Sequence, residues 1–535
     1  MGKKISKRKK AWIERTVDNN REYKNFLYNR FYIYALLALL QFAGWGVFWN
    51  LLVYRSDVAF ATQIVVAVLM FSCTLYILTK HESASSRVGW LLLVLLAPVF
   101  GSLLYITCGE GRPTKAMRRR SEKAQKQNLE AEKEFFGERD ILEPQNRADG
   151  VSRFLMQSAN YPVYNDGDVV YYDSGSKAFE DMKAELEKAE RFILLEYFII
   201  AHGKMWGDIL KILLQKAEEG VQVRIIYDDF GCMTTLPPKY DRYLESLSSN
   251  IRCLSFNNVL PIFSMRMNNR DHRKILVIDG KVAFTGGFNL ADEYIDEKRR
   301  FGYWKDSGVK ITGGAVNSFT RMFFDMWNAF YKGKEDLKKY LVLPFNADIP
   351  ASKEGIAIQP YDDSPLDKIS VGECVYLDMI ERAAKYIYVF TPYLILDDFT
   401  RSALCRAAMR GVDVRIVTPS VPDKKMVYRL TRANYSILMR AGVKIYEYTP
   451  GFMHAKSMLC DGEYAVVGTI NLDYRSLYLH FENALYFANC PAIEDLARDC
   501  EETFAISKLC TKESVKRGLI GRFVDALLRV FETLL

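Results

Sequence analysis

The chain has 535 residues, which is too long for one ordinary hydrophobic core and predicts two domains with additional segments. Its ten cysteines are scattered singly with no Cys-x-x-Cys pair, so neither a zinc site nor a disulfide framework is indicated. The formal charge of +8 is local, because the basic excess lies in residues 1–30 and 112–126, on either side of an apolar block.

That apolar block predicts a membrane domain over residues 31–110, after a basic N-terminal segment over residues 1–30. Its stretches "FYIYALLALLQFAGWGVFWNLLVY", "VAFATQIVVAVLMFSCTLYIL" and "VGWLLLVLLAPVFGSLLYIT" are each long enough to cross a hydrocarbon core about 30 Å thick. A signal peptide is disfavoured, because the run is too long and no small-residue cleavage site follows its first stretch. We therefore expect a multi-pass protein of the cell membrane, with two to three transmembrane helices.

The number of crossings stays open. Basic residues favour the cytoplasmic side of a membrane. Because basic blocks lie on both sides of the apolar block, they predict an even number of crossings. Pro98 and Gly101 interrupt the third stretch, which could be a broken or re-entrant helix, and the first stretch could equally lie in the membrane without crossing it. The unpaired cysteines favour a reducing compartment, so we expect the catalytic domain on the cytoplasmic face.

Residues 111–150 are rich in Lys, Arg, Glu, Gln and Ala and predict a solvated helical linker. Two interpretations of its basic start remain: a contact with anionic lipid headgroups, or an ordinary charged helix face.

Residues 189–229 and 383–420 form an internal repeat, in which a strand, a helix closed by glycine and a second strand follow one another. The second strands, "VQVRII" and "VDVRIV", are β-branched runs suited to a buried sheet. The repeat predicts an α/β fold with two similar halves, residues 151–345 and 346–510, each of parallel type.

The repeat extends through "HRKILVIDGKVAFTGGFNLADEY" and "HAKSMLCDGEYAVVGTINLDYRS". In both copies an asparagine follows the histidine by seventeen residues, and two of only five histidines lie at equivalent points. Core histidines would not be expected to coincide in this way. The paired polar residues are His272, Lys274 and Asn289 in the first half and His454, Lys456 and Asn471 in the second.

Strand geometry separates these residues from the aspartates that follow them. Side chains alternate between the faces of a strand, so each histidine shares a face with the lysine two residues on, whereas Asp279 and Asp461 have the opposite parity. Each aspartate precedes a glycine, which predicts a hairpin turn. We expect the aspartates to shape that turn and to be poor candidates for direct chemistry.

Two imidazoles and two ammonium groups at a pseudo-twofold seam suit a phosphodiester. One neutral imidazole can attack phosphorus, the other can protonate the leaving oxygen, and the lysines can hold the non-bridging oxygens. No metal or other cofactor is needed, and no Asp, Glu and His cluster with ligand spacing occurs in the sequence.

Residues 511–535 end in "IGRFVDALLRVFETLL", whose apolar residues have helical spacing, with charged residues on the other side. The pattern predicts a C-terminal amphipathic helix. Packing on the catalytic domain and lying on the membrane surface are both open.

The doubled motif His-x-Lys-x4-Asp resembles the signature of the phospholipase D superfamily. The stretches "NNRDHRKILVIDGKVAFTGGFNLADEY", "YWKDSGVKI", "GFMHAKSMLCDGEYAVVGTINLDYRSL" and "HFENALYF" resemble bacterial cardiolipin synthases more closely, and "SSRVGWLLLVLLAPVFGSLLYITCGEGR" resembles the end of their membrane hairpin. The resemblance covers nearly everything after about residue 58. It implies two phospholipase D-like α/β sandwich halves with pseudo-twofold symmetry, preceded by N-terminal transmembrane helices.

The resemblance also implies roles for individual residues. It makes His272 the nucleophile that forms a phosphatidyl-histidine and His454 the general acid that then becomes the base. The full assignment gives catalytic motif positions to His272, Lys274, Asp279, His454, Lys456 and Asp461, phosphate binding to Asn289 and Asn471, and histidine orientation to Asp306 and Glu482. Departures from the family pattern are Thr469 for serine, His480 for asparagine and Cys460 for an aliphatic residue.

The implied reaction converts two phosphatidylglycerol molecules into cardiolipin and glycerol at a membrane rich in anionic lipid. A phosphatidylserine synthase or a hydrolytic phospholipase D would keep the same motifs, and both stay open. A nuclease is disfavoured by the membrane segments, so no nucleic acid is expected as a partner. An inactive scaffold is disfavoured because both His and Lys pairs are intact. The sequence leaves the oligomeric state open.

Overall fold

A computed structural model describes the chain in several ranges. They are residues 39, 42–44, 46, 47, 50, 59–80, 84–108, 114–137, 150–259, 268–343, 356–367 and 369–530. The expectations for the basic segment 1–30 and for most of the first apolar stretch lie outside the described residues.

The N-terminal helices α3 (Ala59–Thr79), α4 (Ala84–Leu96) and α5 (Pro98–Cys108) pack on one another around Ile77, Trp90, Val94 and Tyr105. The third apolar stretch is broken into α4 and α5 just where Pro98 interrupts it, because proline cannot continue the hydrogen bonds of a helix. Within the described ranges, no single helix has both the length and the apolarity that crossing a membrane requires.

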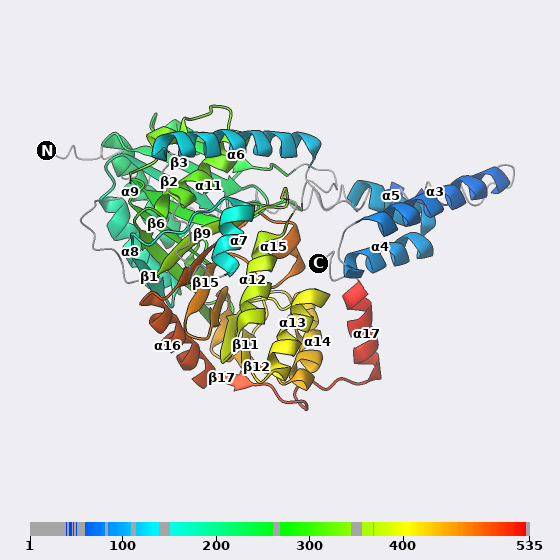
Figure 1. Cartoon of the computed structure of the whole chain (residues 1–535). Helices are drawn as coiled ribbons and strands as arrows, with labels where there is room; N and C mark the ends of the chain where they lie inside the picture. The colour runs from blue at the N-terminus through cyan, green and yellow to red at the C-terminus, as the bar shows by residue number, and fades with distance from the viewer. Residues whose placement is uncertain are drawn as a thin grey trace.

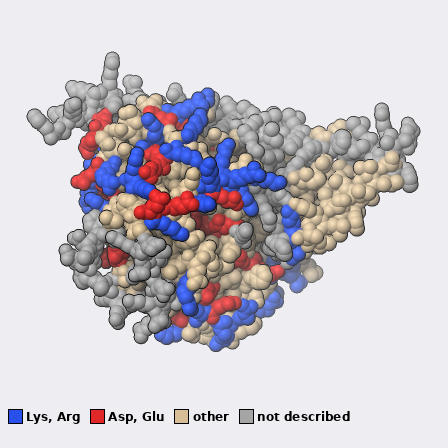
Figure 2. Space-filling model, turned by 45° about the horizontal axis from the view of Figure 1, so that its top comes forward, with Lys and Arg blue, Asp and Glu red and all other residues tan. Residues whose placement is uncertain are grey.

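Helix α6 (Lys115–Phe136) corrects the expectation of a solvated linker. It packs along α11 (Val316–Phe330) and buries Asn128 and Glu132. Asn128 donates to Asp325 Oδ1 at 2.7 Å, and Glu132 pairs with Arg321 at 3.1 Å. The composition of α6 predicts the helix but not its buried face, because polar residues make that contact. On the opposite side Lys and Arg lie among Asp and Glu, on the face that Figure 2 brings forward.

Apart from the last of them, the remaining helices lie around two sheets (Figure 1). They are α7 (Gly150–Ala159), α8 (Gly175–Glu187), α9 (Lys204–Glu218), α10 (Tyr240–Leu247), α12 (Val371–Arg382), α13 (Asp398–Met409), α14 (Lys425–Ala441), α15 (Tyr474–Tyr478), α16 (Ala492–Ala505) and α17 (Leu519–Val530), with short 3-10 turns η3 (Asp292–Ile295) and η4 (Leu337–Lys339). As the sequence predicts, α9 and α13 are each followed by a left-handed glycine, Gly220 and Gly411.

Each half of the chain builds one sheet. The first has β1 (Val169–Tyr172), β2 (Phe192–Tyr197), β3 (Gln222–Asp228), β4 (Ile251–Phe256), β5 (Lys274–Ile278), β6 (Val282–Gly286) and β8 (Gly308–Thr312). The second has β9 (Ala357–Asp363), β10 (Tyr386–Phe390), β11 (Asp413–Pro419), β12 (Lys444–Tyr448), β14 (Ser457–Cys460), β15 (Tyr464–Gly468), β16 (Glu482–Ala488) and β17 (Ser507–Leu509). The strand orders are β1-β8-β6-β5-β2-β3-β4 and β9-β16-β15-β14-β10-β11-β12-β17, so they match position by position until the extra strand β17.

The matching order confirms two similar α/β halves, but the expected parallel type is wrong for more than half of each sheet. Strands β2, β3 and β4 are parallel, as are β10, β11 and β12. The other neighbours pair antiparallel, and tight Asp-Gly hairpins account for two of these pairs, β5 with β6 and β14 with β15. Each sheet is therefore mixed.

The two halves form one body. A single hydrophobic cluster includes Phe319 and Phe323 of α11, Tyr361 of β9 and Leu485 of β16. The chain also pairs across the seam, where β7 (Tyr303–Lys305) runs parallel to β13 (Gly451–Met453). A second crossing joins Asp271 to Phe481 by a bridge. Both crossings lie directly beside the motif histidines.

Candidate active site

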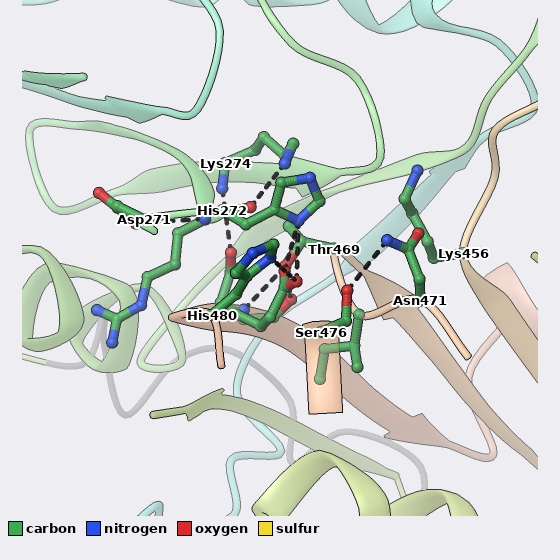
Figure 3. A network of polar contacts seen from close by, with 12 residues as sticks. Asp271, His272, Lys274, Lys456, Thr469, Asn471, Ser476 and His480 are labelled. Carbon is green, nitrogen blue, oxygen red and sulfur yellow. Dashed lines mark hydrogen bonds and ion pairs between the residues drawn. The ribbon is translucent and has the colours of Figure 1, made fainter. Parts of the chain in front are cut away.

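The two His-x-Lys motifs enter the seam at the starts of equivalent strands, β5 and β14. Successive side chains of an extended segment point to opposite faces, so each histidine and the lysine two residues later point to the same face. His272, Lys274, His454 and Lys456 are all buried, with at most 8% of each residue exposed. Figure 3 shows Lys456 of the second half facing His272 and Lys274 of the first. The structure thus brings both motifs into one centre.

Each histidine is held by a carboxylate from the opposite half. Nδ1 of His272 lies 2.8 Å and 2.9 Å from the two carboxylate oxygens of Glu482, and Nδ1 of His454 lies 2.7 Å from Asp306 Oδ2. Both carboxylates are completely buried. A carboxylate on Nδ1 fixes the tautomer and leaves Nε2 free for chemistry, which the orienting role expected for these residues requires.

The backbone explains why the partners are exchanged. The N–H of His272 donates to the carbonyl of Phe481 at 2.8 Å, next to Glu482, and the N–H of His454 donates to the carbonyl of Lys305 at 2.7 Å, next to Asp306. A backbone hydrogen bond therefore joins each histidine to the chain segment that supplies its carboxylate. Neither half can complete a histidine pair without the other.

The lysines are turned toward the backbone of their own motifs. Nζ of Lys274 donates to the carbonyl of His272 at 2.6 Å, and Nζ of Lys456 donates to the carbonyl of His454 and lies 2.8 Å from its Nδ1. Burial lowers the pKa of Lys274 to about 7 and that of Lys456 to about 8, with Glu482 and Asp306 opposing the shift. Both ammonium groups are therefore poised to lose a proton near neutral pH in the absence of an anion.

Burial and the two lysine charges hold the pKa of His272 and of His454 well below the ordinary value. Both imidazoles are therefore neutral at pH 7 in the empty site, which suits a nucleophile. A general acid needs the opposite state. A phosphodiester anion among these groups would offset the lysine charges and raise the pKa of both rings, so binding of the anion prepares the acid.

Because anion binding depends on these lysines, we expect the apparent KM for a phosphodiester lipid to rise as the pH passes through about 7 to 8. The value of kcat should change less, since a bound anion stabilises the ammonium form. Initial rates on phosphatidylglycerol between pH 6 and pH 9.5, fitted for KM and kcat separately, test this. Lys456→Arg, which cannot lose its charge, should flatten the alkaline rise, and a KM that is constant to pH 9.5 in the unaltered protein would contradict the argument.

The asparagines occupy equivalent positions in the two halves. Oδ1 of Asn289 accepts from the N–H of Ile199 at 3.0 Å, and its Nδ2 donates to Tyr294 Oη at 2.6 Å. Nδ2 of Asn471 donates to Ser476 Oγ at 3.0 Å (Figure 3). Each amide nitrogen keeps a second N–H for an anion.

The aspartates of the motifs do not belong to this centre, which corrects their inclusion among the catalytic positions. The carboxylate of Asp279 accepts from the backbone N–H groups of Glu190, Arg191 and Phe192 at 2.7–2.8 Å. Seven residues of extended strand, about 23 Å, separate it from His272. With φ of 54° it forms the left-handed turn that joins β5 to β6, as its Asp-Gly sequence predicts.

Asp461 repeats this arrangement in the second half, where it accepts from the backbone N–H groups of Ala384, Lys385 and Tyr386 at 2.8 Å. Both aspartates therefore anchor the start of the neighbouring strand. Their place in the motif reflects folding rather than chemistry.

We expect Asp279→Ala to lower the free energy of unfolding by about 3 kcal/mol, because buried N–H groups lose a charged acceptor. The value of kcat per folded molecule should stay within about threefold. Denaturant unfolding and active-site-normalised rates separate the two effects, with Asp279→Asn as the matched milder change that keeps an acceptor and tolerates the left-handed conformation. A hundredfold loss of kcat with unchanged unfolding would return Asp279 to the chemistry.

The structure adds residues that sequence reasoning did not place. Thr469 donates to Glu482 Oε2 at 2.5 Å, so the departure from serine keeps the hydroxyl that steadies this carboxylate. The ring of His480 lies 5.7 Å from that of His272, and its Nδ1 lies 3.8 Å from Glu482 Oε1. Burial lowers the pKa of His480 to about 3. The sequence signal for His480 is its position in "HFEN", two residues before Glu482.

Among the described residues, His272, His480 and Glu482 have donor atoms close enough together to hold a metal ion. The sequence hides this group, because its members come from the two halves. A metal there would have to displace the proton on Nδ1 of His272, which Glu482 already accepts. The arrangement fits an orienting carboxylate without a metal.

Comparison with known families places the chain. Residues 182–326 and 376–505 match the family described as "Cardiolipin synthase, PLD-like domain", and residues 68–110 match "Phospholipase_D-nuclease N-terminal". A protein named cardiolipin synthase from Geobacillus kaustophilus is 33% identical over 482 residues, covering 87% of this chain and 93% of that protein. The chain belongs to the cardiolipin synthase family of phospholipase D-like proteins.

Other members and neighbours agree with this placement. An uncharacterized protein of Streptococcus mutans is 44% identical over 463 residues, covering 85% of this chain and 98% of that one. The crystal structure of phosphatidylserine synthase from Haemophilus influenzae superposes with a TM-score of 0.55 at 14% identity, covering 72% of this chain and all of that one. At that identity the likeness concerns the fold alone. For a cardiolipin synthase family member, the paired motifs and the shared seam are the expected architecture, and the two phospholipase D-like α/β halves are confirmed.

Proposed function

We propose that this protein is a cardiolipin synthase, which transfers a phosphatidyl group from one phosphatidylglycerol to the headgroup hydroxyl of a second and releases glycerol. The observation that carries the proposal is the pairing of each motif histidine with a carboxylate of the opposite half, His272 with Glu482 and His454 with Asp306. This pairing gives one centre with two oriented imidazoles, which double displacement at phosphorus needs. The relatives named cardiolipin synthase support the choice of substrate.

In the first half-reaction Nε2 of His272 attacks phosphorus, and the bond from phosphorus to the glycerol oxygen breaks. Protonated His454 gives its proton to that oxygen, so glycerol leaves as a neutral alcohol. Lys274 and Lys456 hold the non-bridging oxygens as charge develops on them. The result is a phosphatidyl-histidine and a neutral His454.

In the second half-reaction a hydroxyl of another phosphatidylglycerol replaces the departed glycerol. His454 takes the proton of that hydroxyl as the new oxygen–phosphorus bond forms and the bond to His272 breaks. The products are cardiolipin, free His272 and protonated His454, which is the state that starts the next cycle. Glu482 on Nδ1 of His272 and Asp306 on Nδ1 of His454 leave Nε2 of both rings free, and the choice of His272 as the nucleophile follows the family resemblance.

A membrane location belongs to the same proposal. Exposed apolar side chains on α3, including Val65, Val68 and Phe71, support insertion of the N-terminal region in the cell membrane. The basic blocks and the unpaired cysteines support a cytoplasmic catalytic body. Protease digestion of intact spheroplasts should leave the catalytic body intact, and cleavage from outside would reverse the orientation.

Incubation of the purified protein with phosphatidylglycerol as the sole lipid tests the reaction. Cardiolipin and glycerol in equal amounts, measured by mass spectrometry, are the expected products. Phosphatidate without cardiolipin would make water the acceptor. No product from phosphatidylglycerol under conditions in which the protein is folded would contradict the proposed donor.

A further inference from the structure

The C-terminal helix α17 is attached to the protein by its polar side. Nε of Arg429 on α14 lies 2.6 Å from Asp525 Oδ1, and its Nη2 donates to the carbonyl of Gly521 at 3.0 Å. Arg517 pairs with the other oxygen of Asp525 at 3.2 Å. Arg529 donates to the carbonyl of Ala433 on α14. Two of the charged residues of this amphipathic helix, Asp525 and Arg529, therefore face inward.

The apolar stripe of α17 faces outward. Leu519 is 78% exposed, Ile520 82%, Phe523 71% and Leu527 51%, and these positions share one side of the helix. A helix that packs on a water-soluble body places its stripes the other way round. The reversal indicates that something apolar lies outside α17.

The neighbours of α17 identify this apolar partner. The helix contacts α4, whose Leu95 is 52% exposed and whose Leu96 is 81% exposed, so exposed apolar side chains lie on both neighbouring helices. Figure 1 shows α17 next to the projecting group of α3, α4 and α5. In Figure 2 that projecting group is almost free of charged residues, in contrast with the rest of the molecule. A lipid bilayer fits this combined surface.

The charges beside the stripe fit the same occupant. Lys512, Lys516 and Arg522 are exposed on or just before α17, with Glu513 among them. Cations at the edge of an apolar helix face favour a surface that contains anionic lipid.

The attachment also relates this surface to the catalytic centre. Helix α14 begins directly after Lys424, whose charge acts on both His272 and His454. Arg429, which holds α17, lies five residues further along the same helix, or about 7.5 Å. The contact of α17 with a bilayer would therefore bring the membrane surface near the helix that begins beside the catalytic centre.

We propose that α17 lies in the membrane surface with Leu519, Ile520, Phe523 and Leu527 among the lipid chains, and holds the catalytic centre against the bilayer that supplies its substrate. This inference rests on the membrane location given under the proposed function. It concerns a lipid surface, and capture of a second copy by the same stripe is the alternative outcome.

Photocrosslinking of the full-length protein tests the position of the stripe. A benzophenone amino acid replaces Phe523 in one variant and Met409 at the end of α13, which is equally exposed at 72%, in the control. In vesicles of phosphatidylglycerol and phosphatidylethanolamine, we expect phospholipid adducts at position 523 to exceed those at 409 about tenfold. Equal adducts at both positions, or a protein–protein crosslink at 523, would overturn the proposal.

A second comparison connects the stripe to turnover. Phe523→Glu should lower cardiolipin formation on vesicles about tenfold relative to Met409→Glu, and the two variants should be equal in detergent micelles. Equal rates on vesicles would overturn the proposal. These experiments distinguish failure of this proposal from failure of the proposed function. Lipid adducts at position 523 without any cardiolipin would support the position of α17 in the membrane and contradict the synthase activity. Cardiolipin without lipid adducts would support the synthase activity and contradict the position of α17.

Discussion

Replacement of His272 by alanine should lower kcat by about 10⁴-fold or more, because no other group can accept the phosphatidyl moiety. The fold should persist, since the backbone hydrogen bond of residue 272 to Phe481 is kept and the side chain loses only its contacts with Glu482 and two neighbouring rings. Rates of cardiolipin formation, normalised to folded protein by circular dichroism, measure the effect.

The matched control is His480→Asn, which removes the neighbouring buried imidazole 5.7 Å away and should cost less than about tenfold. If His272→Ala kept more than a hundredth of the activity, or if the two variants lost activity equally, the nucleophile would have to be sought elsewhere.

The second large effect is expected for Glu482→Gln. The glutamine amide can donate to Nδ1 of His272, which moves the ring proton to Nε2 and removes the lone pair that attacks phosphorus. Loss of the negative charge also removes electrostatic stabilisation from the positively charged ring that forms when His272 carries the phosphatidyl group. By the cost of the same change in other histidine–carboxylate pairs, kcat should fall by about 10³ to 10⁴.

Thr469 provides a graded comparison for this prediction, because its hydroxyl donates to Glu482 at 2.5 Å. Thr469→Ser keeps the donor and should stay within about threefold, whereas Thr469→Val leaves one carboxylate oxygen without this partner and should cost about tenfold. A Glu482→Gln enzyme with unchanged pH dependence and nearly full kcat would show that the carboxylate only fills space.

The sequence predicted the parts of the molecule that are specified locally. Repeated strands and helices fix the two halves, and two-residue spacing on a strand fixes the shared direction of His272 and Lys274. The Asp-Gly pairs likewise predict the turns in which Asp279 and Asp461 lie. In each case the determining interactions lie within a few residues of chain.

What the sequence could not predict depends on contacts between distant segments. The exchange of Asp306 and Glu482 between the halves follows from the pairing of β7 with β13 and from the bridge between Asp271 and Phe481, which no local pattern encodes. The buried face of α6 uses Asn128 and Glu132, so it carries no hydrophobic signal. For α17 the pattern predicted the amphipathic helix, but its inward side is set by one ion pair and by hydrogen bonds with α14.

The central claim is that His272 carries the phosphatidyl group while His454 transfers protons. It is tested most directly with His454→Ala and a phosphatidyl-p-nitrophenol substrate, whose leaving group needs no acid. Without a base the second half-reaction stalls, so a burst of nitrophenolate equal to the enzyme should accompany a phosphatidyl adduct on His272, read by peptide mass spectrometry. An adduct on any other residue, or a burst without an adduct, would contradict the mechanism.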